Sequence, residues 1–151
     1  MADWIRVDGE NFPAGPIESA LSRHPDVVVA VAYGVPDAHA GDQVMAALVL
    51  REGVRFDGAA FARWLDQLED LGPKWRPRYV RIVVGDLPMT GTNKVVKRVL
   101  VHQKYRRDRV GNDELWIRER GDATYRPFTN SDETALREAM IAAGRERFWE
   151  L

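Results

Sequence analysis

The hydrophobic positions of this chain follow two kinds of pattern, one typical of strands and one typical of helices. The β-branched run at residues 27–33 is apolar throughout, as expected of a strand buried on both faces, and Gly34 and Pro36 follow it as stop signals. Residues 43–50 have the same character and predict an antiparallel neighbour, joined to the first strand by a polar segment too long for a tight hairpin. Shorter strands are expected at residues 4–7, 79–84, 115–118 and 124–126.

Apolar residues spaced three and four apart predict helices between these strands. The clearest helix begins at Asp57, a good N-cap residue, ends near residue 71, and presents an apolar face made of Phe61, Trp64, Leu65 and Leu68. Further helices are expected at residues 16–23, 95–105 and 132–143. The last of them carries an apolar stripe that predicts docking, made of Ala135, Leu136, Ala139 and Met140. These elements predict an α+β fold, in which a small and mostly antiparallel sheet is flanked by helices and followed by a C-terminal extension.

Composition narrows the class of protein. With 151 residues, of which 45% are hydrophobic and 30% charged, the chain has the size and balance of one globular domain. It has no cysteine, which excludes disulfides and thiolate zinc sites. Its apolar runs are far shorter than the ~20 residues that span a bilayer, and no signal peptide opens it, so we expect a cytoplasmic protein, either free or at a membrane surface.

Charge is nearly balanced overall but not locally. The net charge of −1 argues against a generic nucleic-acid-binding protein. One stretch near the middle of the chain is nevertheless strongly basic and is opposed only by Asp108; it contains Lys94, Lys97, Arg98, Lys104, Arg106, Arg107 and Arg109. Such a stretch is either a solvated helix face or an anion-binding patch. The three histidines, His24, His39 and His102, show no metal-ligand spacing, and no metal site is expected.

Three segments, taken in order, resemble the late motifs of a known enzyme superfamily. Residues 3–11 read Asp-Trp-Ile-Arg-Val-Asp-Gly-Glu-Asn, residues 33–37 read Tyr-Gly-Val-Pro-Asp, and residues 87–94 read Leu-Pro-Met-Thr-Gly-Thr-Asn-Lys. Their order and spacing are similar to those of the AMP-forming acyl-CoA synthetase, nonribosomal adenylation and luciferase superfamily. Residues 114–117 and 124–129 look like the tail of its long- and very-long-chain fatty acid branch, which includes fatty acid transport proteins.

The resemblance implies a domain of a larger enzyme. Residues 1–105 would be the mobile C-terminal domain of an acyl-CoA synthetase, with its hinge at Ala2, and residues 106–151 an extension that packs on it. The family's large adenylate-binding domain, which would hold most of the ATP and Mg2+, has no counterpart in these residues, so the isolated domain is expected to be inactive. Within a complete fatty acid–CoA ligase it would serve ATP-dependent formation of an acyl-AMP and then transfer of the acyl group to CoA.

The resemblance also assigns roles to particular residues. Lys94 occupies the position of the family's adenylation lysine, whose positive charge would stabilise charge moving between carboxylate, phosphate and pyrophosphate. Asn93 stands before it where most members have glycine, and Asn tolerates the left-handed backbone better than other non-glycine residues. Two further groups of residues would contact CoA. Gly9, Glu10 and Asn11, in an expected turn, would line the path of its pantetheine arm, and Arg76 and Arg78 would meet its phosphates.

Other interpretations of the same residues are left open by the sequence. A loop lysine is usually a solvated surface charge, and a glycine such as Gly9 often serves only a turn. Within the superfamily the substrate could be another carboxylic acid, because acyl specificity belongs to the other domain. Acetylation of Lys94 would remove its charge and switch off the first half-reaction. Outside the superfamily, the chain could be a free-standing anion-binding or regulatory module that uses residues 94–109 on nucleic acid or membrane.

Overall fold

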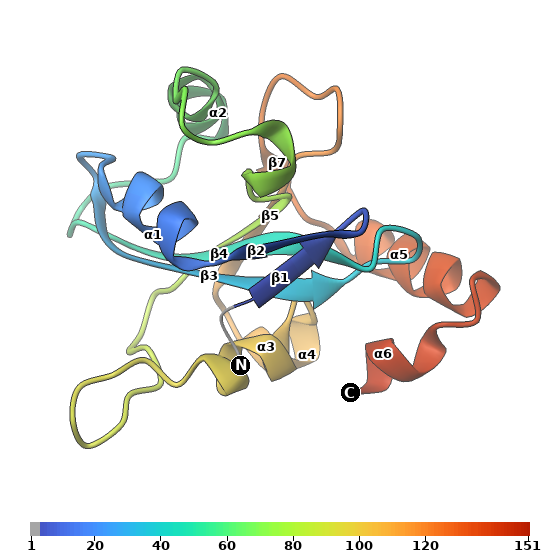
Figure 1. Cartoon of the computed structure of the whole chain (residues 1–151). Coiled ribbons are helices and arrows are strands. Elements are labelled where there is room, and N and C mark those ends of the chain that lie inside the picture. The colour runs from blue at the N-terminus through green and yellow to red at the C-terminus, as the bar shows by residue number, and fades with distance from the viewer. Residues whose placement is uncertain (1–3) are drawn as a thin grey trace.

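The computed structural model describes residues 4–151 and is built around one five-stranded sheet (Figure 1). The expected hinge residue Ala2, and Asp3 of the first motif, lie outside the described residues. The strand order is β3-β4-β5-β6-β7. These strands are β3 (Val27–Pro36), β4 (Asp42–Leu50), β5 (Tyr79–Ile82), β6 (Glu114–Ile117) and β7 (Arg126–Pro127). All neighbouring pairs are antiparallel except β4 and β5, which are parallel.

Side chains alternate between the two faces of this sheet, and each face has its own hydrophobic core. On the first face, Ala46 and Val80 pack under α1 (Gly15–Ser22), α2 (Gly58–Asp66) and the hairpin of β1 (Trp4–Val7) and β2 (Glu10–Pro13). On the second face, Tyr33 and Met45 pack against the helices of the second half of the chain. These helices are α3 (Lys97–Gln103), α4 (Arg107–Val110), α5 (Asn130–Ala142) and α6 (Glu146–Glu150). The sheet is therefore covered on both sides (Figure 1).

The expected α+β architecture is confirmed, together with most of its elements. The antiparallel pairing of the two long strands is as predicted, and Asp57 caps α2 by accepting a hydrogen bond from the Ala60 amide at 3.0 Å. The stripe on α5 docks as expected except at Ala135, which is exposed: Met140 is fully buried, and Leu136 and Ala139 pack beside it in the second-face core.

Several boundaries differ from the prediction. Strand β3 continues through Gly34 to Pro36, because Gly34 pairs with Val44 in the ladder and Pro36 is its last residue. Helix α2 stops at Asp66, where the amides of Gln67 and Leu68 bond to carbonyls three residues back instead of four. The helix expected at residues 95–105 is shorter at both ends, and four short elements were not predicted: β2, η1 (Pro73–Trp75), α4 and α6.

The first hairpin turns at Asp8 and Gly9, not at residues 9–11. Both turn residues have positive φ, 51° and 81°, which is the requirement of the tight turn that best fits the twist of a hairpin. Glu10 and Asn11 belong to β2. An added Cβ on Gly9 would meet no atom within 4 Å, so glycine is needed there for its backbone conformation rather than for space.

Residues 106–151 share the sheet and the core of the preceding residues. Strand β6 pairs with β5, and Tyr125 is buried in the first-face core, where its hydroxyl donates to the Pro77 carbonyl. Thr129 and Asp132 form a reciprocal capping box at the start of α5. Within residues 4–151 there is no helix both long and apolar enough to cross a membrane.

Candidate functional site

Residues 85–96, which make up most of the segment between β5 and α3, are called the lysine loop here because Lys94 lies near their end. Met89 and Val95 form an isolated antiparallel bridge, and the Thr90 amide donates to the Lys94 carbonyl at 2.8 Å. The Thr90 hydroxyl oxygen accepts in return from the Lys94 amide at 3.1 Å. The loop thus holds its own shape through hydrogen bonds between its two sides.

Asn93 makes the sharp turn just before the lysine. Its φ is 62°, in the left-handed region, and its amide donates to the Thr90 carbonyl at 3.0 Å. Asn is one of the few residues with a side chain that adopt this conformation readily, so the loop keeps a closed turn without a glycine at this position.

The side chain of Lys94 is exposed. Among residues 4–151 no carboxylate lies within ion-pair distance of its ammonium, and no hydrogen bond to the ammonium is formed. The loop projects away from the sheet and its helices, as the yellow segment at the lower left of Figure 1 shows. Its charge is consequently available to a group outside the described residues.

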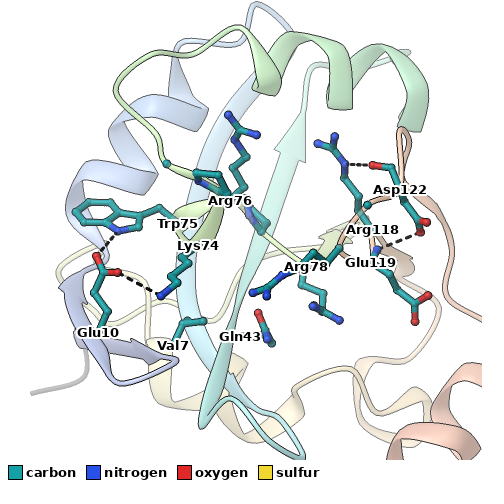
Figure 2. Close-up of a pocket in the computed structure, with 15 residues that line it drawn as sticks. Val7, Glu10, Gln43, Lys74, Trp75, Arg76, Arg78, Arg118, Glu119 and Asp122 are labelled. Carbon is teal, nitrogen blue, oxygen red and sulfur yellow. Dashed lines mark hydrogen bonds and ion pairs between the residues drawn. The ribbon is translucent and has the colours of Figure 1, made fainter.

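A cleft of about 520 Å³ lies elsewhere on the domain and is called the arginine cleft here (Figure 2). Its walls come from three separate places: the β1–β2 hairpin with the start of β4, the segment around η1, and the turn after β6. Its lining residues are Val7, Glu10, Gln43, residues 72–78 and residues 118–122. Of the residues predicted to contact CoA, Glu10, Arg76 and Arg78 line this cleft, whereas Gly9 and Asn11 do not.

Glu10 ties the hairpin to the segment around η1. Its carboxylate accepts from the Trp75 indole nitrogen at 3.2 Å and lies 4.0 Å from the Lys74 ammonium. Trp75 in turn stacks on Phe12 of β2, with ring centroids 4.7 Å apart and the planes inclined by 13°. This wall of the cleft is therefore a fixed surface, visible at the left of Figure 2.

The arginines that line the cleft differ in whether their guanidinium groups already bind a carboxylate of the domain. Arg118 binds both carboxylate oxygens of Asp66 at 2.8 Å, and Arg76 approaches the same carboxylate at 3.2 Å. The hydrogen bonds from Arg118 are the largest cause that lowers the pKa of Asp66 below its ordinary value, so this carboxylate stays ionised. The guanidinium of Arg118 is thus occupied by a partner within the domain, and that of Arg76 makes one ion pair there, although its buried Nε has no hydrogen-bond partner among the described residues.

Arg78 is the exception. Its backbone is fixed on both sides, because its amide donates to the Val44 carbonyl at 2.9 Å and its carbonyl accepts from the Arg118 amide at 2.8 Å. Within residues 4–151 its guanidinium has neither an ion pair nor a hydrogen bond. Figure 2 places it in the cleft beside Gln43. A rigid backbone with an uncommitted guanidinium is suited to binding a phosphate.

The lysine loop and the arginine cleft lie at opposite ends of β5. The cleft residues 72–78 lead into the first residue of this strand, Tyr79, and the loop leaves after its last residue, Ile82. The predicted site residues therefore form two separate groups. Sequence reasoning missed Gln43, Trp75, Arg118 and Arg120, since the turn that carries the last two is brought to the cleft only by the pairing of β6 with β5.

Most of the basic stretch at residues 94–109 is turned inward. Lys97 pairs with Glu18 at 2.9 Å, Arg106 with Asp108 at 3.0 Å, and Arg109 donates to the Glu150 carbonyl at 2.9 Å. Lys104 is buried, and burial is the main cause that lowers its pKa to about 8. These contacts make the stretch a poor candidate for a general anion-binding patch. Within the described residues, no three His, Asp or Glu side chains gather as a metal site would require.

Comparison with known proteins gives consistent matches. A family model described as the AMP-binding enzyme C-terminal domain matches residues 16–94. Steroid-22-oyl-CoA synthetase of Rhodococcus jostii (strain RHA1) is 46% identical over 148 residues, which are 97% of this chain and 26% of that protein. Medium/long-chain-fatty-acid--CoA ligase FadD17 of Mycobacterium tuberculosis is 52% identical over 100 residues, 66% of this chain and 20% of that protein.

Solved structures agree with these sequence matches. Apo MatB from Rhodopseudomonas palustris superposes with a TM-score of 0.59 at 36% identity, covering 65% of this chain and 19% of that chain. A Mycobacterium tuberculosis fatty acyl CoA synthetase gives a TM-score of 0.58 at 27% identity, covering 67% and 19%. The chain thus spans only about a fifth to a quarter of the length of these proteins.

Proposed function

The chain belongs to the AMP-binding enzyme C-terminal domain family of acyl-CoA synthetases, and we propose that it is the mobile domain that delivers Lys94 to the first half-reaction. In that step a carboxylate attacks the α-phosphate of ATP and pyrophosphate leaves. The observation that carries the proposal is the exposed ammonium of Lys94, without an internal partner in residues 4–151, on a projecting and internally bonded loop.

The physical role of Lys94 in this proposal is electrostatic. Negative charge is redistributed among the carboxylate, the α-phosphate and the departing pyrophosphate, and a fixed cation close to these oxygens lowers the barrier. A partner inside the domain would weaken that effect, because the ammonium would have to leave it first. The closed turn at Asn93 and the bond between Thr90 and Lys94 limit the positions that the charge can take.

The second half-reaction is assigned to the opposite end of the domain. Transfer of the acyl group to CoA needs a surface that binds phosphates and leaves a path for the pantetheine arm. Arg78 supplies an uncommitted guanidinium in the arginine cleft, and Glu10 borders the same cleft. Because cleft and lysine loop lie at opposite ends of β5, the domain would have to rotate between the two steps to present each of them in turn. ATP and Mg2+ would be held mainly by the adenylate-binding domain.

The proposed substrate is a fatty acid. Support comes from the medium/long-chain-fatty-acid--CoA ligase FadD17, which is 52% identical to this chain over 100 residues. A second candidate is a steroid-22-oyl substrate, because the synthetase of that name matches 97% of the chain and therefore includes most of the extension. Acyl-CoA formation by the complete synthetase with each class of acid, compared by kcat/KM, distinguishes the two.

The proposal for Lys94 is tested by separating the half-reactions in the complete synthetase that carries this chain. We expect Lys94→Ala to slow acyl-AMP formation, measured by pyrophosphate release, by roughly 100- to 1,000-fold. Thioester formation from supplied acyl-AMP and CoA should change little, because the lysine is withdrawn in that step.

Arg78→Ala is the reciprocal variant. It should raise the KM for CoA and leave acyl-AMP formation intact, since Arg78 lies in the arginine cleft and has no part in the lysine loop. If Lys94→Ala reduced both half-reactions by the same factor, the lysine would not have the proposed role. If Arg78→Ala changed neither, the cleft would not be the CoA surface.

A further inference from the structure

A buried ion pair lies between the central sheet and the segment that follows α4. Arg81 of β5 is 7% exposed and Asp113 is 8% exposed, and the Arg81 Nε atom donates to Asp113 Oδ2 at 2.8 Å. The backbone of Asp113 is held in turn, because the Arg107 guanidinium donates to its carbonyl at 2.8 Å. Asp113 lies outside residues 16–94, the part of the chain matched by the family model.

The second carboxylate oxygen of Asp113 reaches the start of the lysine loop. Asp113 Oδ1 accepts from the Val84 amide at 3.1 Å. The preceding amide, Val83, still bonds to the Leu48 carbonyl of β4 at 2.9 Å. The Val84 side chain is 74% exposed, so packing does not hold this residue. Within the described chain, the backbone bonds of the next residues are internal to the lysine loop, and the Asp113 carboxylate is the last polar anchor before it.

The same network reaches the element at the other end of the loop. Arg81 Nη1 donates to Gln103 Oε1 of α3 at 2.6 Å. The start of α3 is held separately, since the Lys97 ammonium pairs with Glu18 at 2.9 Å. The pair of Arg81 and Asp113 thus links β5, α3 and Val84, the residue just before the lysine loop. Leu87 and Val95 add only partly buried apolar contacts at the base of the loop.

We propose that Asp113 is a positioning residue for Lys94, so that the C-terminal extension takes part in the first half-reaction. This inference rests on the proposed role of Lys94. A buried ion pair is weak evidence for stability as such, because desolvation of the two charges offsets their attraction. The pair instead fixes the orientation of the base of the loop, because both carboxylate oxygens of Asp113 and the guanidinium of Arg81 have fixed partners. A small tilt there would shift the projecting loop and, with it, the exposed ammonium of Lys94.

The first test is Asp113→Asn in the complete synthetase. The amide keeps the size of the carboxylate but cannot accept from both Arg81 Nε and the Val84 amide, because one of its two groups is a donor. We expect acyl-AMP formation to fall by about 10- to 100-fold in kcat with little change in the KM for ATP, since misplacement of about 1 Å can have that effect. Thioester formation from supplied acyl-AMP should change by less than about twofold. Asp113→Glu keeps the negative charge, so its acyl-AMP formation should fall less than that of Asp113→Asn.

Asp108→Asn is the matched control, because Asp108 is an exposed aspartate of the same extension that pairs with Arg106. It should leave both half-reactions unchanged. Amide hydrogen exchange gives a second readout: the Val84 amide should exchange faster in Asp113→Asn, while the Val83 amide, bonded to Leu48, should keep its protection.

A second variant distinguishes loss of the positioning role from loss of the folded structure. In Arg81→Met/Asp113→Leu no charge is left buried without a partner, and such replacements are often tolerated by the fold. If this folded double variant loses acyl-AMP formation selectively, the positioning role is supported. Normal acyl-AMP formation, or equal loss of both half-reactions, would overturn it. Lys94→Ala, measured in parallel, tests the underlying function separately, because its failure to slow acyl-AMP formation would refute the role of the lysine whatever Asp113 does.

Discussion

Gly58, the first residue of α2, lies against the backbone of the extension at Tyr125. A Cβ added there would fall far inside contact distance of the Tyr125 carbonyl oxygen, 3.0 Å from its carbonyl carbon and 3.2 Å from its Cβ. The Tyr125 amide also donates to the Gly58 carbonyl at 3.3 Å. Gly58→Ala would therefore force either α2 or the Tyr125 backbone to move.

The expected magnitude is the balance of three contributions. Alanine in a helix gains at most about 1 kcal/mol over glycine. Overpacking against a backbone group costs about 1 to 3 kcal/mol, and losing the Tyr125 hydrogen bond about 1 kcal/mol more. We expect a net loss of roughly 1 to 3 kcal/mol in the free energy of unfolding, or a fall of roughly 2 to 12 °C in Tm for a domain of this size.

Urea denaturation of the 151-residue chain, followed by tryptophan fluorescence, measures this change. Gly72→Ala is the matched control: its backbone, with φ −65° and ψ 163°, suits alanine, and an added Cβ there meets nothing within 4 Å. It should be neutral or slightly stabilising. A Gly58→Ala chain as stable as the parent would mean that residues 118–129 do not pack on α2 as described.

Two further predictions concern buried and partly buried polar groups. The Tyr33 hydroxyl is buried without a hydrogen-bond partner among the described residues, whereas the Tyr105 hydroxyl donates to the Pro36 carbonyl at 2.6 Å. Tyr33→Phe should therefore leave the midpoint of urea denaturation unchanged or raise it. Tyr105→Phe should lower the free energy of unfolding by about 1 to 3 kcal/mol. The reverse order would contradict the assigned contacts. The hydrogen bonds from Arg126 are the main cause that lowers the pKa of Asp132 to about 2. The contribution of Asp132 to the free energy of unfolding is therefore complete above about pH 4, where the side chain is ionised in the unfolded chain as well. This contribution is lost as the pH falls from about 4 through 2. Asp132→Asn should lower stability at pH 7 by about 1 kcal/mol, allowing for solvent screening, and the gap between variant and parent should narrow below pH 4; a gap independent of pH would refute this.

Local signals predicted the larger elements of the fold because those signals are strong. The apolar runs of β3 and β4, the cap at Asp57 and the stripe on α5 each depend on residues close in sequence. The short elements were missed for the opposite reason: α4 and α6 have no strong pattern of their own, and they form where Val110 and Trp149 are buried by the second-face core. Their existence depends on tertiary packing rather than on propensity.

Some residues of the candidate site could likewise be predicted from local sequence, and others only from the tertiary structure. Lys94 and Asn93 could be picked out from one motif, because a loop that folds on itself is specified by neighbouring residues. Arg78 could be named, but not distinguished from Arg76, since only the structure shows that Arg76 is already paired with Asp66. Nothing in the sequence indicated that Arg118 and Arg120 would line the arginine cleft.

The sequence by itself determined that this chain is an α+β domain with a lysine-bearing loop, and its motifs were enough to indicate the family. Only the tertiary structure decided which charges are free to act. Asp113 lies 32 residues from Arg81, and Asp66 lies 52 residues from Arg118, so no spacing rule could pair them. Whether a charged side chain is buried and paired or left exposed depends on which distant segments the sheet brings beside it. That leaves Lys94 without a partner in the described part of the chain, and it commits most of the neighbouring cations to partners of their own.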